Sequence, residues 1–125
     1  MHVEILFTPE AIVTPPEQLP SREIGAAVDF RGIVREMEKG EALPGLFYEA
    51  YEPMARRVLD RHFAELGLLH HCAAVHFIHR TGWVPVGEAS LFLRVQSAHR
   101  GQALAFLAEA IDRLKQDVPI WKRVQ

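Results

Sequence analysis

Two stretches of this sequence repeat their apolar residues at helical spacing, and the stretches around them have the patterns of strands and turns. Pro53 stands where prolines favour the start of a helix, and we expect Ser97 to cap the second helix. The apolar residues are Met54, Val58, Leu59, Phe63, Leu66 and Leu69 in the first helix, and Ala103, Phe106, Leu107, Ala110, Ile111 and Leu114 in the second. Pro119 ends the second helix, because the residue before a proline disfavours helical angles. The sequence therefore predicts two helices, each with one apolar face.

The remaining segments predict strands separated by turns. Strand patterns occupy residues 2–7, 25–36, 46–51, 71–82 and 89–97. Residues 8–25 contain four prolines, which break helices and cannot donate to a sheet, so we expect a loop with at most a short helical turn. Residues 37–45 predict a polar, mobile loop and residues 83–88 a turn. This order predicts an α+β fold with a largely antiparallel sheet, and the length predicts a single domain over residues 1–125.

Charge and composition argue against several classes of function. The 14 lysines and arginines and the 16 aspartates and glutamates give a net charge of −2, whereas a nucleic-acid binder needs a basic face. Cys72 is the one cysteine, so no intrachain disulfide can form and a reducing compartment is expected. The first residues lack the pattern of a signal peptide, and no apolar stretch reaches the ~20 residues of a membrane span. We therefore expect a cytoplasmic protein with neither a nucleic-acid nor a membrane partner.

Histidines gather between residues 70 and 79, together with Cys72. In a strand, however, His76 and His79 point to opposite faces. No two histidines have the i, i+4 spacing of a zinc-binding helix, and no CxxC motif is present. We therefore expect surface and strand-end histidines, with no metal and no cofactor.

Three cationic side chains could bind an anion. His99 and Arg100 fall in the first turn of the second helix, where free N–H groups and the positive dipole end favour anions. Two cations at this helix end are unfavourable unless an anion lies between them. The pattern therefore allows two interpretations, an anion-binding site and an exposed cap whose charges are solvated. Arg35 closes a predicted strand and offers a planar fork for phosphate or carboxylate, although a solvated arginine is the commoner case. Phe30 and Ile111 are core candidates first and ligand-lining residues second.

Two lysines lie near the end of the sequence. Lys115 follows Ile111 by four residues at the edge of the apolar stripe, and Lys122 follows Trp121. A lysine can act as acid, base or nucleophile near neutral pH when burial or nearby cations favour its neutral form. A lysine in the last turn of a helix also simply suits the helix dipole, so both interpretations remain open.

Several of these stretches together resemble one family. They are "GAAVDFRGIVRE", "LFYEAYEPMA", "HRTGWVPVGEAS", "VQSAHRGQALAF" and "AIDRLKQDVPIWKR", which follow one another in family order from Gly25 to Arg123. With its F-x-G-x-V-R, S-A-H-R and L-K-x-x-x-P-x-W-K motifs, the sequence resembles the large, catalytic subunit of molybdopterin synthase. This resemblance implies an α/β hammerhead-type fold with an added small antiparallel β subdomain.

The resemblance also implies a reaction and its partners. The family's enzyme converts cyclic pyranopterin monophosphate to molybdopterin by installing two sulfurs as a dithiolene. Sulfur arrives as a thiocarboxylate on the C-terminal glycine of a small ubiquitin-like subunit, whose tail enters a pocket of the large subunit. The assembly is a heterotetramer around a central homodimer of large subunits. By this resemblance the chain would be a sulfurtransferase of molybdenum cofactor biosynthesis.

Roles for individual residues follow from the same resemblance. Lys115 would be the essential lysine near the thiocarboxylate carbon, and Lys122 the second active-site lysine. Arg35, His99 and Arg100 would hold the phosphate and pterin of the substrate. The substrate-binding set would also include Ile33, Val34, Arg123 and Val124, and the pocket walls would be Phe30 and Ile111.

The spacing of Arg100 and Lys115 is a separate geometric point. Fifteen residues of one helix span roughly 22 Å, too far for both side chains to contact one small substrate. Either the helix is broken, or Arg100 and His99 act in a pocket that Lys115 of another copy completes. We favour the second interpretation, because a symmetric dimer places the start of one helix near the end of its mate.

The end of the chain carries two further expectations. Pro119 would turn the chain so that Lys115 and Lys122 face one pocket, and Trp121 would anchor that turn. Family members usually continue past the W-K-R segment with an acidic residue and a longer tail, whereas this sequence ends at Gln125. The segment after the first strand is short and rich in proline, where the family commonly has a helix.

Two other hypotheses stay open. One is a non-catalytic relative that binds the small partner or a phosphorylated pterin without turnover. The two retained lysines favour the enzyme, and the missing tail favours the binding protein. The other hypothesis, a phosphate- or metal-binding domain, rests on the histidines alone.

Overall fold

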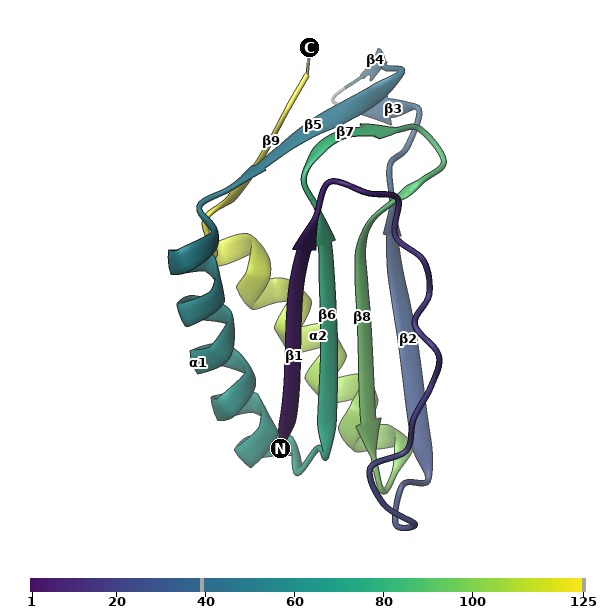
Figure 1. The fold of residues 1–125 in the computed structure, drawn as a ribbon, viewed down its shortest axis with the longest axis vertical. Coiled ribbons are helices and arrows are strands. Elements are labelled where there is room, and N and C mark those ends of the chain that lie inside the picture. The colour runs from purple at the N-terminus through teal and green to yellow at the C-terminus, as the bar shows by residue number, and fades with distance from the viewer. Residues whose placement is uncertain (39, 125) are drawn as a thin grey trace.

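The computed structural model describes residues 1–38 and 40–124, which form two helices and nine strands (Figure 1). In chain order the elements are β1 (His2–Thr8), β2 (Ala26–Ile33), β3 (Met37–Glu38), β4 (Glu41–Ala42), β5 (Gly45–Ala50), α1 (Glu52–His70), β6 (Ala74–Arg80), β7 (Gly82–Pro85), β8 (Ala89–Ser97), α2 (Arg100–Asp117) and β9 (Ile120–Arg123). The predicted α+β class is confirmed. Both predicted helices and all five predicted strands are present, although several of their ends differ.

A four-stranded sheet in the order β1-β6-β8-β2 forms the main layer, and α1 and α2 both cover one of its faces (Figure 1). β1 and β6 are parallel, whereas β6 pairs with β8 and β8 with β2 in antiparallel fashion. β8 is buried along nearly its whole length, which fits its central place in the sheet. The prediction of a largely antiparallel sheet is confirmed.

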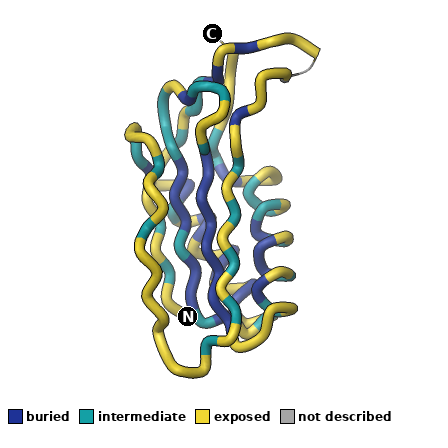
Figure 2. The backbone as a smooth tube through the Cα atoms, turned by 90° about the vertical axis from the view of Figure 1, so that its right-hand side faces the viewer, coloured by how far each residue is buried: buried dark blue, intermediate teal, exposed yellow. Residues whose placement is uncertain are grey.

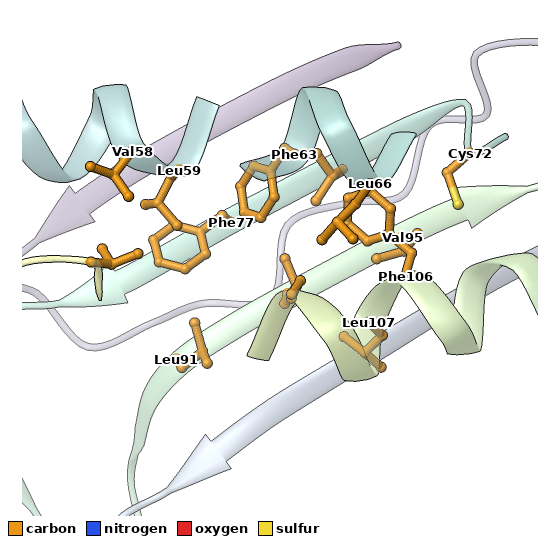
Figure 3. Close-up of a cluster of buried hydrophobic side chains, with 14 of the residues drawn as sticks. Val58, Leu59, Phe63, Leu66, Cys72, Phe77, Leu91, Val95, Phe106 and Leu107 are labelled. Carbon is orange, nitrogen blue, oxygen red and sulfur yellow. The ribbon is translucent and has the colours of Figure 1, made fainter. Parts of the chain in front are cut away.

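The main core lies between this sheet and the two helices (Figure 3). Phe63 of α1 packs against Phe77 of β6 and Phe106 of α2, with ring centroids 6.0 and 5.9 Å apart. Leu59 and Leu66 flank Phe63 on α1 and are fully buried. Burying a side chain of this size contributes ~1.5–3 kcal/mol. The apolar stripes of both helices are therefore what fixes them on the sheet.

Residues 9–25, which we call the proline strap, form neither helix nor strand and cross the opposite face of the sheet (Figure 1). Gln96 of β8 donates from Nε2 to the Gln18 carbonyl at 3.0 Å. Arg94 of β8 reaches the Pro16 carbonyl at 3.5 Å. The prediction of a loop is confirmed, and the strap explains why the outer face of β8 is buried.

A second sheet, in the order β7-β5-β9, extends beyond one end of the main sheet (Figure 1). Its strands are antiparallel, and it has a small core of its own formed by Val34, Leu43, Leu46 and Val84. The short hairpin β3–β4 lies within the segment that was predicted as a loop. The expected small β subdomain is confirmed.

Three local predictions are wrong. Residues 83–85 of the turn predicted over 83–88 belong to a strand, β7, because β5 pairs with them. His99 is the N-cap of α2, while Ser97 remains the last residue of β8 and donates its hydroxyl to the His99 carbonyl at 2.6 Å. Trp121 is 60% exposed and does not anchor the turn after α2. The buried residue of that turn is Val118, at the C-cap.

Candidate functional site

Lys115 lies in the last turn of α2, where the helix dipole favours a cation. Its side chain is exposed, directly after the half-buried Leu114. Val118 caps the helix in an extended conformation with φ −78° and ψ 127°, and Pro119 follows. The helix therefore ends where the proline predicted, and the chain turns directly into β9.

β9 carries Lys122 and Arg123 and pairs with β5. Arg123 Nη2 lies 3.0 Å from Glu49 Oε1, and the Arg123 guanidinium lies 4.8 Å from the centre of the Phe47 ring. Sequence reasoning missed this strand, because four residues after a proline give no periodic signal. β9 follows directly on the C-terminal end of α2 (Figure 1), so Lys122 lies on the strand that continues from the helix end that carries Lys115.

Four charged or polar side chains hold the last turn of α2 to α1, and sequence reasoning missed them. His62 of α1 is buried, with its Nε2 2.7 Å from Asp117 Oδ1. Arg113 Nη1 lies 3.1 Å from His62 Nδ1 and 2.6 Å from Glu65 Oε1. Because arginine only donates, this geometry requires the tautomer with the proton on Nε2, which donates to Asp117. These four residues form what we call the helix clasp.

A sequence signal for the helix clasp exists. Asp117 is an acidic residue in the last turn of a helix, where the dipole disfavours negative charge. Such a residue needs a partner outside its own helix. His62 is a buried polar residue among the apolar residues on the buried face of α1, and it supplies that partner.

Ile33, Val34 and Arg35 stand at the end of β2 beside the second sheet. The strand stops at Ile33, so the predicted strand over residues 25–36 is too long. Val34 is buried in the small core; its N–H donates to the Glu88 carbonyl at 3.0 Å, and its carbonyl accepts from the Gly87 N–H at 2.9 Å. The Val34 amide is therefore already engaged within the chain. Ile33 and Arg35 are exposed.

The two predicted pocket walls come from the main sheet and the second helix. Phe30 of β2 and Ile111 of α2 are both partly buried against the main core. Each therefore has a packed side and an open side, as a pocket wall requires. Val124 follows β9 and is exposed.

His99 and Arg100 lie at the opposite end of α2 (Figure 1). The backbone N–H of His99 donates to Gln102 Oε1 at 3.2 Å, and both cationic side chains are exposed. α2 is one unbroken helix from Arg100 to Asp117, so Arg100 and Lys115 are separated by roughly 22 Å. One copy of the chain brings Lys115 and Lys122 to one end, and leaves His99 and Arg100 at the other.

A cavity of about 450 Å³ lies elsewhere, between the proline strap and the outer face of the sheet. Its polar lining includes Glu4, His76 and Arg94, and none of the predicted site residues lines it. Arg94 is held by Asp29 through two hydrogen bonds of 2.7 and 2.9 Å. Burial lowers the pKa of His76. This cavity is separate from the cationic groups at the ends of α2.

The histidine-rich segment has structural roles. His79 is buried, its Nδ1 lies 2.8 Å from the Arg80 carbonyl oxygen, and burial lowers its pKa. Burial raises the pKa of the Cys72 thiol to about 11, which makes it a poor nucleophile at neutral pH. Within residues 1–38 and 40–124, no group of three His, Cys, Asp or Glu side chains is arranged to hold a metal ion. No helix in that part of the chain is long and apolar enough to cross a membrane.

Fold and site together define a class of protein: a helix-covered sheet with a small second sheet, whose exposed cations lie at the two ends of one long helix. A family model described as MoaE protein matches residues 7–117. The molybdopterin synthase catalytic subunit of Bacillus subtilis is 40% identical over 120 residues, which cover 96% of this chain and 76% of the relative. That of Drosophila willistoni is 37% identical over 126 residues, which cover 98% of this chain and 33% of the relative. The chain therefore belongs to the MoaE family of molybdopterin synthase catalytic subunits.

Solved structures have the same fold. Molybdopterin synthase from Staphylococcus aureus matches with a TM-score of 0.85 and 35% identity, covering 98% of this chain and 89% of that chain. The complex of subunits 1 and 2 of molybdopterin-converting factor from Helicobacter pylori matches with a TM-score of 0.71 and 23% identity, which supports the fold alone. The curated relatives differ in length: this chain spans 51% of the Oryza sativa relatives.

Proposed function

We propose that this chain catalyses the sulfur transfer of molybdopterin synthase, from the C-terminal thiocarboxylate of a small ubiquitin-like subunit to cyclic pyranopterin monophosphate. The observation that carries the proposal is the placement of two lysines in a chain of this family. Lys115 in the last turn of α2 and Lys122 on β9 belong to the L-K-x-x-x-P-x-W-K segment by which the sequence resembles the family, and β9 follows directly on the C-terminal end of α2.

The substrates are anionic, and the exposed cations suit them. The pterin substrate carries a phosphate, and the carrier tail ends in a thiocarboxylate. Arg35 offers a bidentate fork for such a group, and Lys122 adds a point charge. Lys115 is proposed to promote attack on, or breakdown of, the acyl–sulfur intermediate. Each carrier tail brings one sulfur and leaves as a carboxylate with oxygen from water, so a dithiolene requires two carrier molecules.

A second copy of the chain is needed to complete the proposed site. His99 and Arg100 lie roughly 22 Å from Lys115 along one helix, and no bend in α2 shortens that distance. In a two-fold dimer, the N-terminal end of one α2 can approach the C-terminal end of the other. We propose that His99 and Arg100 of one copy hold the phosphate beside Lys115 of the other.

The small partner subunit follows from family membership and from the relatives. The Helicobacter pylori structure is a complex of two different subunits, and one chain of it has the fold of this chain. We propose that the partner's tail passes the second sheet and reaches Lys115 along a path whose walls are Phe30 and Ile111, which are partly buried against the main core. The assembly would be a heterotetramer with the homodimer at its centre.

A second candidate function is binding without turnover. The engaged amide of Val34 and the pairing of Arg123 with Glu49 leave fewer groups available to a substrate than the family resemblance implied. A relative of this kind would hold the partner or a phosphorylated pterin and release it unchanged.

Reconstitution separates the two candidates. The purified chain is mixed with cyclic pyranopterin monophosphate and a thiocarboxylated small partner, and the dithiolene product is measured as its oxidised fluorescent derivative. Product formation supports the enzyme. Partner binding without any product would support the non-catalytic relative.

Mixing two damaged variants, assayed at a substrate concentration well below the wild-type KM, tests whether the site is shared. Arg100→Ala and Lys115→Ala each damage both sites of their own homodimer. In a 1:1 mixture, half of the dimers are mixed, and each mixed dimer has one undamaged site, so about a quarter of wild-type activity should return. A mixture no more active than its components would mean that the two residues act within one chain.

A further inference from the structure

The cavity between the proline strap and the outer face of the main sheet has no part in the proposed function. Its volume of about 450 Å³ lies in the range of small-molecule sites. The strap runs as a mostly exposed segment along the side of the sheet that the helices leave open (Figure 2). Its side of the cavity is formed by Pro15, Pro16, Gln18, Leu19 and Pro20, and the floor comes from β1, β6 and β8. The cavity therefore has a mainly apolar wall that faces a sheet.

Two polar side chains of this floor are buried and keep unused capacity for hydrogen bonds. Gln96 is 4% exposed and Arg94 is 6% exposed. The Gln96 side-chain amide donates from Nε2 to the Gln18 carbonyl at 3.0 Å, whereas none of the described residues donates a hydrogen bond to its Oε1. Buried polar atoms in folded proteins are nearly always paired. The open oxygen at the cavity therefore requires a donor from water or from a ligand.

Carboxylates outnumber cations around this floor. Arg94 is the one lysine or arginine among the described residues that line the cavity. Asp29 accepts two hydrogen bonds from its guanidinium at 2.7 and 2.9 Å, and Glu17 Oε2 lies 3.8 Å from Arg94 Nε. Two negative charges therefore already accompany the one positive charge, and they oppose the binding of a further anion.

Glu4 supplies a third carboxylate at the other end of the floor. Glu4, His76 and Arg94 stand next to one another on β1, β6 and β8, so Glu4 lies two strand spacings, ~10 Å, from Arg94. Glu4 Oε2 lies 3.3 Å from His76 Nε2, and burial lowers the pKa of His76. A neutral His76 that donates from Nε2 to Glu4 has a lone pair on Nδ1. This end of the floor therefore presents acceptors, and His76 does not cancel the charge of Glu4 at neutral pH.

We propose that this cavity binds a small organic cation, a protonated primary amine with an apolar body. The ammonium group supplies three N–H donors and would lie at Glu4, where the acceptors are. The apolar body would lie against the prolines of the strap, whose rings offer apolar contact and no N–H. Such a site prefers the opposite charge to the exposed cations at the two ends of α2, and it does not rest on the proposed function.

The strap leaves an entrance on the side of β1. The side chains that bind the strap to the sheet come from β8: Gln96 donates to the Gln18 carbonyl at 3.0 Å, and Arg94 reaches the Pro16 carbonyl at 3.5 Å. Within the described part of the chain, no side chain of β1 or β6 makes a hydrogen bond to residues 10–20. The Glu4 side chain is 53% exposed. A cation can therefore reach this carboxylate while the strap stays in place.

Titration of the intact, isotope-labelled chain with three probes of similar size tests the charge preference by nuclear magnetic resonance. Benzylammonium is a cation, benzyl alcohol is neutral and benzoate is an anion. At about pH 8, where imidazoles are neutral, benzylammonium should shift the amide resonances of Ala74, His76 and Gln96 and bind about fivefold more tightly than benzyl alcohol. Benzoate should leave these resonances unchanged. Equal binding of the three probes, or no shift of these resonances by benzylammonium, would overturn the proposal.

Two matched substitutions test the role of Glu4. Glu4→Gln keeps the shape of the side chain and removes its charge, so the affinity for benzylammonium should fall about fivefold and that for benzyl alcohol should not change. Glu10→Gln removes the same charge from an exposed position that does not line the cavity, and it should bind both probes like wild type. Equal affinities of the two variants for benzylammonium would refute Glu4 as the partner of the cation. None of these measurements needs the pterin substrate or the small subunit, so their outcome is separate from that of the sulfur-transfer assay.

Discussion

The two ends of α2 both carry cations, but for different physical reasons. At the C-terminal end, Lys115 lies where the negative pole of the helix favours a cation, so the dipole alone accounts for its charge. At the N-terminal end, Arg100 is the first helical residue after the His99 cap, and the first turn contains no acidic residue. A cation there destabilises the isolated helix unless an anion offsets it. The position of a charge in the fold therefore separates a cation that needs a ligand from one that does not.

The ends also differ in how firmly they are held. The helix clasp and β9 fix the C-terminal end, through His62, Asp117 and the pairing with β5. The N-terminal end has an exposed cap with a 3.2 Å contact to Gln102. Under the proposed function, Lys115 benefits from a fixed position, whereas the N-terminal end of α2 is completed by an anion and a second copy of the chain. The following predictions test this difference, from the largest effect to the smallest.

Lys115→Ala should lower turnover about a thousandfold, because a positioned acid–base or nucleophilic group contributes ~10²–10⁴ to a rate. The rate of dithiolene formation measures this, with partner binding followed separately. Lys115→Arg is the matched control, since it keeps the charge and loses the lysine amine. Wild-type rates in Lys115→Ala would show that Lys115 serves only the helix dipole.

Arg100→Ala should weaken substrate binding about tenfold or more, because it removes a charge-assisted contact to phosphate. The effect should appear mainly in KM, whereas Lys115→Ala should act mainly on kcat. Arg57→Ala, on the exposed surface of α1, is the control. If Arg100→Ala lowered kcat alone, the contrast between a binding end and a reacting end would fail.

His62→Ala should lower the free energy of unfolding by about 1–3 kcal/mol, since it leaves the helix clasp without its buried centre. Urea denaturation of the apo chain measures this. His62→Gln keeps an amide N–H near Asp117 and should recover part of the loss in both stability and kcat. Recovery of stability without any change in kcat between the two variants would show that the clasp supports the fold and does not position Lys115.

Much of the fold was readable from the sequence, because its dominant signals are local. The two apolar stripes predicted both helices, and the strand patterns of apolar residues predicted the strands of the main sheet. β9 was missed because a strand that short forms only when β5 is already present to pair with it. Ser97 was assigned as a cap because its residue type suits one, but β8 holds it as a strand residue down to its end.

The residues of the candidate site were likewise only partly predictable from the sequence. Residue types and spacing indicated the lysines and the arginines, and helix geometry alone indicated that Arg100 and Lys115 could not meet in one chain. The acidic Asp117 in the last turn of α2 indicated that it needs a partner, but that partner could not be predicted, since His62 lies 55 residues away and meets Asp117 only after both helices pack. The position of β2 at the edge of the main sheet likewise could not be predicted, because it depends on the order of the strands.

The smallest predicted effect tests the difference between the helix ends directly. Arg100→Gln should raise the free energy of unfolding, and Lys115→Gln should lower it, each by about 0.3–1 kcal/mol, because one removes a cation from the positive pole and the other from the negative pole. Glutamine is chosen because its helix propensity is close to that of arginine and lysine. Both substitutions are made in the otherwise wild-type chain at one protein concentration, and unfolding is followed by circular dichroism in urea. High salt should shrink both effects, and added phosphate should stabilise the wild-type chain more than Arg100→Gln. Destabilisation by Arg100→Gln in the absence of phosphate would mean that Arg100 has a structural partner, and the N-terminal end would then need no anion to account for its charge.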